Sequence, residues 1–315
     1  MIAKQRKEGL SPIAIITLVV LVLYTVSLLF PVFWTIMTSF KHIDDYDYGA
    51  YDKYGQLITE GVMVKNQFGW PKKWTFDNFI TAYKHFNIQV EIIYEGEAYK
   101  VGYGIFGQFM NSLKYAVGCG ITTTFTSLIM GYATARFRYK FSNYIYMFVL
   151  VTMALPIVGA MPSEIAVATK LGIFGTFPGI WIMRATFLNT YFLIFYAQFR
   201  MIPYDYTEAA KIDGASQFTI MWRIIVPLAS ATISAVFVLN FIAYWNDFQI
   251  PKIYLENYPV AALGMYMFEY STEADLAKPP IKLAGIWILA TPIVIFYAIF
   301  NKKLTVNLSV GGIKG

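Results

Sequence analysis

Hydrophobic positions along this chain of 315 residues form long runs that short polar connections separate. A helix needs about 20 mostly apolar residues to cross a bilayer, and six runs approach or exceed that length. The pattern therefore predicts an all-α polytopic membrane protein, with residues 1–315 forming a single transmembrane domain. The six predicted transmembrane helices cover 11–40, 106–135, 142–162, 177–199, 228–247 and 283–300.

Composition agrees with a membrane environment. Hydrophobic residues make up 57% of the chain and charged residues only 14%, and the mean hydropathy of +0.51 is too high for a soluble domain of this length. The run at 11–40 is too long for the apolar part of a cleaved signal peptide, so we expect a retained helix. One cysteine and two histidines exclude a disulfide framework and argue against a dedicated metal site.

Basic residues are concentrated in alternate connections. Twelve basic residues stand against four acidic ones in one set, while the other set is balanced or slightly acidic. The positive-inside rule then predicts that both termini and the connection at 203–227 are cytoplasmic. It also explains the net charge of +6 without any nucleic-acid partner. The basic residues are Lys4, Arg6, Lys7, Arg136, Arg138, Lys140, Arg200, Lys211, Arg223, Lys302, Lys303 and Lys314.

The segment 41–105 is the sizeable connection predicted to lie outside the cell. Two short β-like pieces, 89–94 and 98–103, flank the turn signal Glu95-Gly96-Glu97. Residues 74–83 have the pattern of a short amphipathic helix. We expect a small extracytoplasmic loop region, too short to be a catalytic domain.

The connection at 203–227 is more organised than a turn between two membrane helices requires. Glu208 falls early in a predicted short helix, and Gly214 can end that helix in the left-handed conformation. Ser216 can cap a second short helix, and Pro227 marks the start of the next span. We interpret the two short helices as a docking surface with a flat alanine face. The alternative is a solvated loop that carries these residues by chance. The docking prediction rests on Glu208, Ala209, Ala210, Asp213, Gly214, Ala215 and Pro227.

These residues resemble the cytoplasmic "EAA" loop of permease subunits in ATP-binding-cassette (ABC) importers. Other segments narrow the resemblance to carbohydrate-type permeases like the smaller maltose permease subunit, over nearly the whole chain. One departure is the sequence from Trp245 to Phe248, which is similar to sugar permeases generally but not to the maltose subunit. The further matching segments are Asn111-Ser112-Leu113, Ala133 with Arg136-Phe137-Arg138, Tyr258-Pro259-Val260-Ala261, Leu263-Gly264-Met265 and Val310-Gly311-Gly312-Ile313-Lys314-Gly315.

The resemblance implies a subunit of a carbohydrate importer in a bacterial or archaeal cytoplasmic membrane. Its partners would be a second homologous permease, a homodimeric or heterodimeric ABC ATPase, an extracytoplasmic solute-binding protein and membrane lipid. ATP and Mg would be bound by the ATPase, with no cofactor on this chain. The loop at 203–227 would be the coupling helix that enters a cleft of the ATPase. In the cytoplasmic tail 301–315, Gly311, Gly312 and Lys314 would reach the ATPase interface; a solvated terminus is the alternative.

Two further sets of candidate residues lie toward the outer side. Trp245, Asn246 and Asp247 end the fifth predicted helix, and polar residues at membrane depth are candidates for a pathway or gate. The alternative to a pathway role is that Asp247 simply lies at the end of a helix at the membrane interface. The loop that follows offers candidate contacts for the binding protein at Tyr254, Glu256 and Tyr258.

Rival functions differ in what they require of the sequence. No phosphate-binding loop of the G-x-x-x-x-G-K-[ST] kind occurs, so nucleotide hydrolysis would belong to another chain. A membrane-embedded enzyme would need titratable clusters within the spans, which offer only Lys114 and Arg184. A stand-alone secondary transporter would need carboxylates at mid-membrane. The cargo stays open between a sugar, an oligosaccharide and a glycerol phosphate-like solute.

Overall fold

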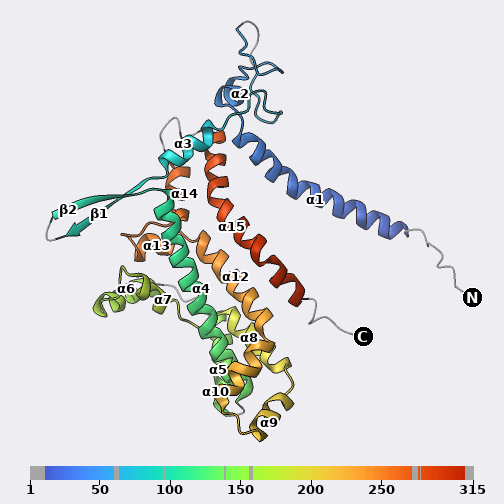
Figure 1. Ribbon diagram of the computed structural model, residues 1–315, viewed down its shortest axis with the longest axis vertical. Helices are drawn as coiled ribbons and strands as arrows, with labels where there is room; N and C mark the ends of the chain where they lie inside the picture. Colours follow the sequence, from blue (N-terminus) through green and yellow to red (C-terminus); the bar gives the residue numbers. More distant parts are fainter. Residues whose placement is uncertain are drawn as a thin grey trace, which may run out of the picture. The chain divides into compact units, whose positions relative to one another are not determined.

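The computed structural model describes residues 11–59, 64–94, 97–137, 140–155, 159–271, 276 and 278–308 (Figure 1). The chain divides into two compact units. Unit 1 comprises Met1–His85 and Phe268–Ile288, and unit 2 comprises Phe86–Met267 and Leu289–Gly315.

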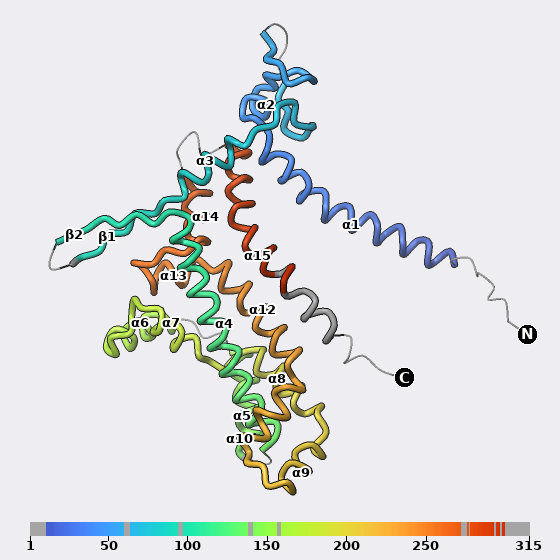
Figure 2. The backbone as a smooth tube through the Cα atoms, viewed as in Figure 1, coloured from blue at the N-terminus to red at the C-terminus, as the bar shows by residue number. Residues whose placement is uncertain are grey.

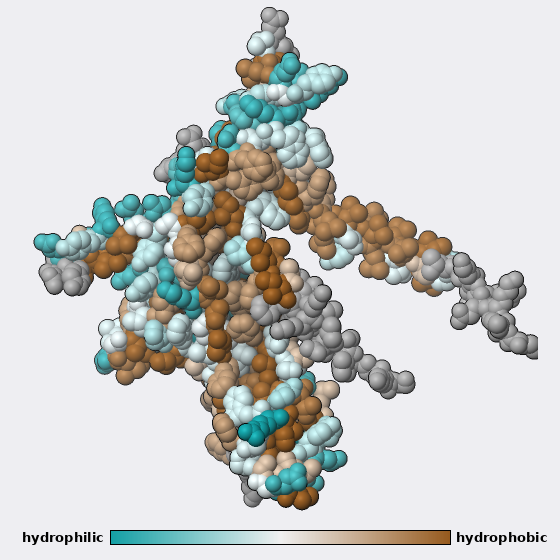
Figure 3. All heavy atoms as spheres, viewed as in Figure 1, coloured by the Kyte–Doolittle hydropathy of each residue, from teal (hydrophilic) through white to brown (hydrophobic). Residues whose placement is uncertain are grey.

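Unit 1 contains the first long apolar helix, α1 (Pro12–Ser39). Ser11 caps it by accepting a hydrogen bond from the backbone N–H of Ala14, and Pro12 fits the first turn because its missing N–H would be unpaired there anyway. Hydrophobic atoms cover most of its surface (Figure 3). The predicted helix at 11–40 is confirmed.

A small polar core fixes the segment after α1. This segment includes α2 (Ile43–Tyr48), which ends at Gly49 with φ of 64°, and α3 (Asp77–His85). The buried amide of Asn78 donates to the carbonyls of Ser39 (2.9 Å) and Lys41 (2.8 Å), which ties α3 to the end of α1. The amphipathic helix predicted at 74–83 is therefore present, starting three residues later.

Unit 2 begins with an antiparallel hairpin of β1 (Ile88–Tyr94) and β2 (Glu97–Tyr103). The register pairs Ile88 with Tyr103 and Tyr94 with Glu97. Both strands lie within one residue of the predicted pieces, because apolar alternation and a Gly-containing turn are local signals.

The long helix α4 (Ile105–Arg136) organises the rest of unit 2. It packs against α8 (Thr190–Met201) and α12 (Ser230–Asn246), and Figure 2 shows it running from the hairpin to the opposite end of the unit. Gly131 allows a close approach to α8, since a Cβ there would lie 2.8 Å from the Cβ of Phe195. The predicted helices at 106–135 and 228–247 correspond to α4 and α12.

The predicted span at 177–199 is wrong as one continuous helix. It forms α7 (Phe177–Met183) and α8, with residues 184–189 non-helical between them. Asn189 accepts a hydrogen bond from the N–H of Phe192 and so starts a new helix inside the apolar run. The predicted span at 142–162 corresponds to α5 (Lys140–Ala154) and the start of α6 (Ala160–Lys170).

Three helices of the described residues are long and apolar enough to cross a membrane: α1, α4 and Pro279–Phe296 of α15 (Pro279–Leu308). A fourth is counted if Gln217–Leu228 and Ser230–Asn246, bent by 76°, form one broken span. The predicted count of six is thus not confirmed by helix length alone. The remaining helices of unit 2 include α13 (Gln249–Tyr254) and α14 (Ala261–Glu269).

Candidate functional site

Two short helices meet at a glycine at one end of unit 2. They are α9 (Asp205–Ile212) and α10 (Gln217–Ile220), which continues through the π-helix η1 (Met221–Ile225) into α11 (Val226–Leu228). Gly214 has φ of 78°, the left-handed conformation that glycine adopts without strain. Ser216 caps α10 by accepting from the N–H of Thr219 at 3.1 Å. Both local predictions are confirmed.

The two faces of α9 differ in exposure. Thr207 and Ala210 are buried against the unit, three positions apart as the helical period requires. The prediction that Ala209 and Ala210 form one exposed face is therefore wrong for Ala210, which packs in the core cluster with Phe199. Ala209 and Glu208 remain on the exposed face.

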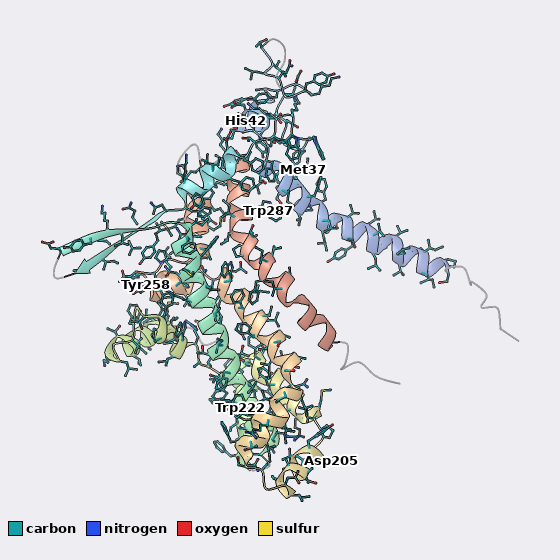
Figure 4. All side chains as sticks on the ribbon, in the orientation of Figure 1. Met37, His42, Asp205, Trp222, Tyr258 and Trp287 are labelled. Carbon is teal, nitrogen blue, oxygen red and sulfur yellow. The ribbon has the colours of Figure 1, made fainter. Side chains whose placement is uncertain are left out.

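Apolar side chains accompany these exposed residues. Ile212 is 86% exposed, Phe218 71% and Tyr206 50%. Figure 4 places Asp205 at the far end of unit 2, with Trp222 further in along the same unit. Exposed apolar groups gathered at a protruding end are typical of a surface that another protein covers.

The other predicted docking residues surround the glycine turn. Asp213 is the exposed C-terminal cap of α9, and Ala215 is partly buried against the core cluster. Pro227 lies in α11, directly before the 76° bend that leads into α12. The structure thus brings these residues together with Glu208 in one continuous element.

A buried arginine holds this element in place. Arg136, the last residue of α4, is 6% exposed and donates to the carbonyl of Ile202 and the hydroxyl of Thr207, each at 2.7 Å. Longer bonds reach the carbonyls of Phe199 and Pro203, each at 3.4 Å. The guanidinium therefore satisfies carbonyls at the end of α8 and the buried face of α9. Sequence reasoning assigned Arg136 only to the charge bias and the family resemblance.

The candidate pathway residues have structural partners. Trp245 is buried, and the amide of Asn246 donates to the carbonyl of Ile242 in its own helix at 2.9 Å. Asp247 accepts from the Tyr115 hydroxyl at 2.8 Å and from the N–H groups of Gln249 (3.0 Å) and Ile250 (3.2 Å). The geometry favours the alternative in which Asp247 is a helix terminus, capping α13.

A polar stripe on α4 was missed from the sequence. Thr123 donates to the carbonyl of Arg184 at 2.9 Å, and Ser127 donates to the side-chain oxygen of Asn189 at 3.1 Å. The Thr123 bond, with a longer bond from Ser127 to the carbonyl of Thr186 at 3.5 Å, satisfies part of the non-helical backbone between α7 and α8, which must be paired where water is scarce. The signal was present in the sequence: Tyr115, Cys119, Thr123 and Ser127 recur every fourth position along an apolar helix.

The outer-loop prediction is corrected at one residue. Tyr254 is only 2% exposed, and its hydroxyl donates to Glu164 at 3.0 Å, so its side chain is not available as a surface contact. Glu256 is exposed, and Tyr258 is 36% exposed with its ring 5.1 Å from that of Phe177. The tail residues Gly311, Gly312 and Lys314 lie outside the described residues. No group of three or more potential metal ligands occurs among residues that the structure describes.

Long apolar helices, a helix broken within the apolar region and a protruding polar element define a polytopic membrane subunit. The chain belongs to the family of binding-protein-dependent transport system inner membrane components, whose sequence profile matches residues 124–306. It is therefore a permease subunit of an ATP-driven ABC importer in the inner membrane, and not an enzyme. The resemblance noted from the sequence is confirmed, and the secondary-transporter and enzyme alternatives are set aside.

Individual relatives agree with this family. The chain is 25% identical over 301 residues to the diacetylchitobiose uptake system permease protein NgcG of Streptomyces coelicolor, covering 95% of this chain and 88% of that protein. It is 29% identical to the probable starch degradation products transport system permease protein AmyC of Thermoanaerobacterium thermosulfurigenes, covering 80% and 85%. A crystal structure of a bacterial ABC transporter involved in import of the acidic polysaccharide alginate shares the fold, with a TM-score of 0.71, 19% identity and coverage of 95% and 100%.

Proposed function

We propose that this permease subunit imports a sugar or oligosaccharide and is driven through the loop from Glu208 to Pro227. The carbohydrate cargo is supported by relatives named for diacetylchitobiose, starch products and trehalose. A glycerol phosphate-like solute is the second candidate cargo. The observation that carries the coupling role is the protruding α9–α10 element, exposed on one face and fixed by Arg136 on the other.

The proposed coupling joins a partner surface to α4 and α8. Glu208 lies free for a basic group of the ATPase, and Ile212 can enter an apolar recess beside it. Because Arg136 bonds α9 and the end of α8 to α4, movement of α9 displaces both longer helices. ATP and Mg would bind the ATPase, so this chain needs no cofactor of its own.

The proposed topology has six crossings with both termini cytoplasmic. α1, α4, α5, α12 and α15 each provide one, and α7 with α8 provides a broken one. Broken helices are tolerated at membrane depth where other groups satisfy the freed backbone, as Thr123 does for the carbonyl of Arg184 and Ser127 for that of Thr186. The basic residues near Arg136, Arg200 and Arg223 support the cytoplasmic placement of α9.

The proposed assembly contains a second homologous permease, a pair of ABC ATPase subunits and an extracytoplasmic solute-binding protein. The family implies partners of these three kinds, and their composition is our proposal. Tyr258 and Asp205 are well separated within unit 2 in Figure 4, as contacts with a binding protein and an ATPase would require. Of the candidate outer contacts, Glu256 and Tyr258 remain accessible.

The test is charge reversal in the complete transporter, reconstituted in vesicles with its ATPase and binding protein. Glu208→Lys is expected to abolish uptake of a labelled oligosaccharide, because the variant places a cation against the basic partner group. The matched control is Glu91→Lys on the exposed face of the hairpin, which we expect to transport normally. Normal uptake by Glu208→Lys with an active ATPase would refute the coupling role. Uptake of glycerol phosphate but no oligosaccharide would refute the cargo alone.

A further inference from the structure

A loop rich in aromatic residues folds back along the last turns of α1 in unit 1. The ring of Phe33 lies 6.2 Å from that of Trp70, and the ring of Trp34 lies 5.8 Å from that of Phe68. The indole of Trp34 also donates to the carbonyl of Gln67 at 3.2 Å. The chain therefore turns back after α1, so that residues 67–70 lie beside Phe33 and Trp34 in that helix.

The loop presents its large apolar side chains to the surroundings. Phe68 is 79% exposed, Trp70 63%, Trp74 53% and Phe76 70%. We call these four residues the aromatic loop. Such a concentration of exposed rings is unfavourable in water and marks a contact surface.

The level of this contact along α1 matches the thickness of a bilayer. From Pro12 to Phe33 the helix rises about 32 Å at 1.5 Å per residue, close to the hydrocarbon thickness of about 30 Å. The remaining turns to Ser39 then lie in the headgroup region. Tryptophan rings concentrate at this boundary, where a large apolar body and one N–H donor are both accommodated.

Hydrogen bonds from polar residues hold the aromatic loop in this conformation. The buried ammonium of Lys41 donates to the carbonyls of Asn66 (2.6 Å) and Gly69 (2.7 Å). The amide of Asn66 donates to the carboxylate of Asp45 (3.0 Å) and the carbonyl of Trp70 (2.9 Å). The backbone around Phe68 is thus fixed before any partner binds, so little ordering is needed on contact.

We propose that the aromatic loop inserts into the headgroup–acyl boundary of the leaflet at the C-terminal end of α1. Lipid is the occupant that fits, because the loop continues the exposed apolar surface of α1, a helix long and apolar enough to cross a membrane. Lys65 and Lys72 flank the loop in the sequence, and their ammonium groups would lie at the level of the lipid phosphates once the rings insert. The loop would fix the depth of the extracytoplasmic segment relative to the bilayer.

The test measures the depth of Phe68 in the complete transporter in lipid nanodiscs. In a Cys119→Ala background that retains transport, Phe68→Cys is labelled with an environment-sensitive fluorophore. Quenching is then compared between iodide in the water, nitroxide near the headgroup end of the acyl chain, and nitroxide near its middle. Tyr54→Cys, 75% exposed in the same unit, is the matched control.

We expect the label at position 68 to be quenched most by the shallow nitroxide and protected from iodide, and the label at position 54 to show the reverse. Equal iodide quenching at both positions would overturn the proposal. Protection from every quencher would also overturn it, since a protein partner would then cover the loop. Lys41→Met should shift the label at 68 toward iodide while the exposed control Lys53→Met does not, and an unchanged depth would refute the role of Lys41.

Discussion

Removing the guanidinium of Arg136 is the sharpest perturbation of α9 and α10, the proposed coupling element. In Arg136→Gln, the bonds to Ile202 and Thr207, both 2.7 Å, lose their charged donor. A hydrogen bond to a charged group contributes about 1.5–3 kcal/mol, so the two short bonds represent about 3–6 kcal/mol. Some of the released carbonyls can bond to water at this end of the unit, so we expect a destabilisation of about 3 kcal/mol.

The reactivity of Cys119 provides the stability assay. It is the only cysteine of the chain and is fully buried, so a thiol-reactive dye reports unfolding of unit 2 during heating in detergent. Arg136→Gln is expected to melt earlier than the wild type. The same variant is expected to bind the ATPase yet lose the stimulation of ATP hydrolysis by loaded binding protein, because α9 is no longer bonded to α4.

A double-mutant cycle isolates the bond itself. Thr207→Val keeps the shape of the side chain and removes the acceptor. If Arg136 acts on α9 through this hydroxyl, the double variant should be less destabilised than the sum of the two singles by about 1–2 kcal/mol. Additive effects, or wild-type stimulation of ATP hydrolysis in Arg136→Gln, would refute the reasoning.

Three further perturbations test other parts of the structure. Gly214→Val should lower the free energy of unfolding by about 1–2 kcal/mol because of the φ of 78° alone, since nothing lies within 4 Å of a new Cβ. The control is Gly104→Ala, where the space is equally open but φ is −68°, and this variant should melt like the wild type. Gly131→Val should cost about 2–3 kcal/mol because its Cβ would lie 2.8 Å from that of Phe195, and unchanged melting would contradict the close α4–α8 packing. Burial lowers the pKa of Lys41 from 10.5, so the unfolded chain binds the proton more tightly and unit 1 should gain stability as pH rises toward that value. Proteolysis of the segment after α1, measured against pH, checks this, and a dependence that persists in Lys41→Met would contradict it.

Local signals in the sequence were sufficient for several elements. The hairpin, the left-handed Gly214 and the cap at Ser216 each depend on residues close together in the chain, so their chemistry could be interpreted directly. The long apolar runs likewise predicted α1, α4 and α12.

Features that depend on distant partners could not be predicted in the same way. The break between α7 and α8 lies in an apolar run, and hydroxyl groups of α4 about 60 positions earlier bond to two of its carbonyls. The residues next to Ala210 and Tyr254 in the sequence are typical of exposed segments. Packing against distant elements is what buries these two side chains. The role of Arg136 depends on carbonyls more than 60 positions away.

The spacing of bonds along α4 has a mechanical consequence. Tyr115 bonds to Asp247 about a third of the way along this helix, and Arg136 bonds to Thr207 at its C-terminal end, about 32 Å further along the axis. An α-helix of this length resists compression, so an axial shift that strains one attachment must strain the other at the same time. We therefore expect the attachments at Asp247 and Thr207 to shift together whenever α4 moves along its axis.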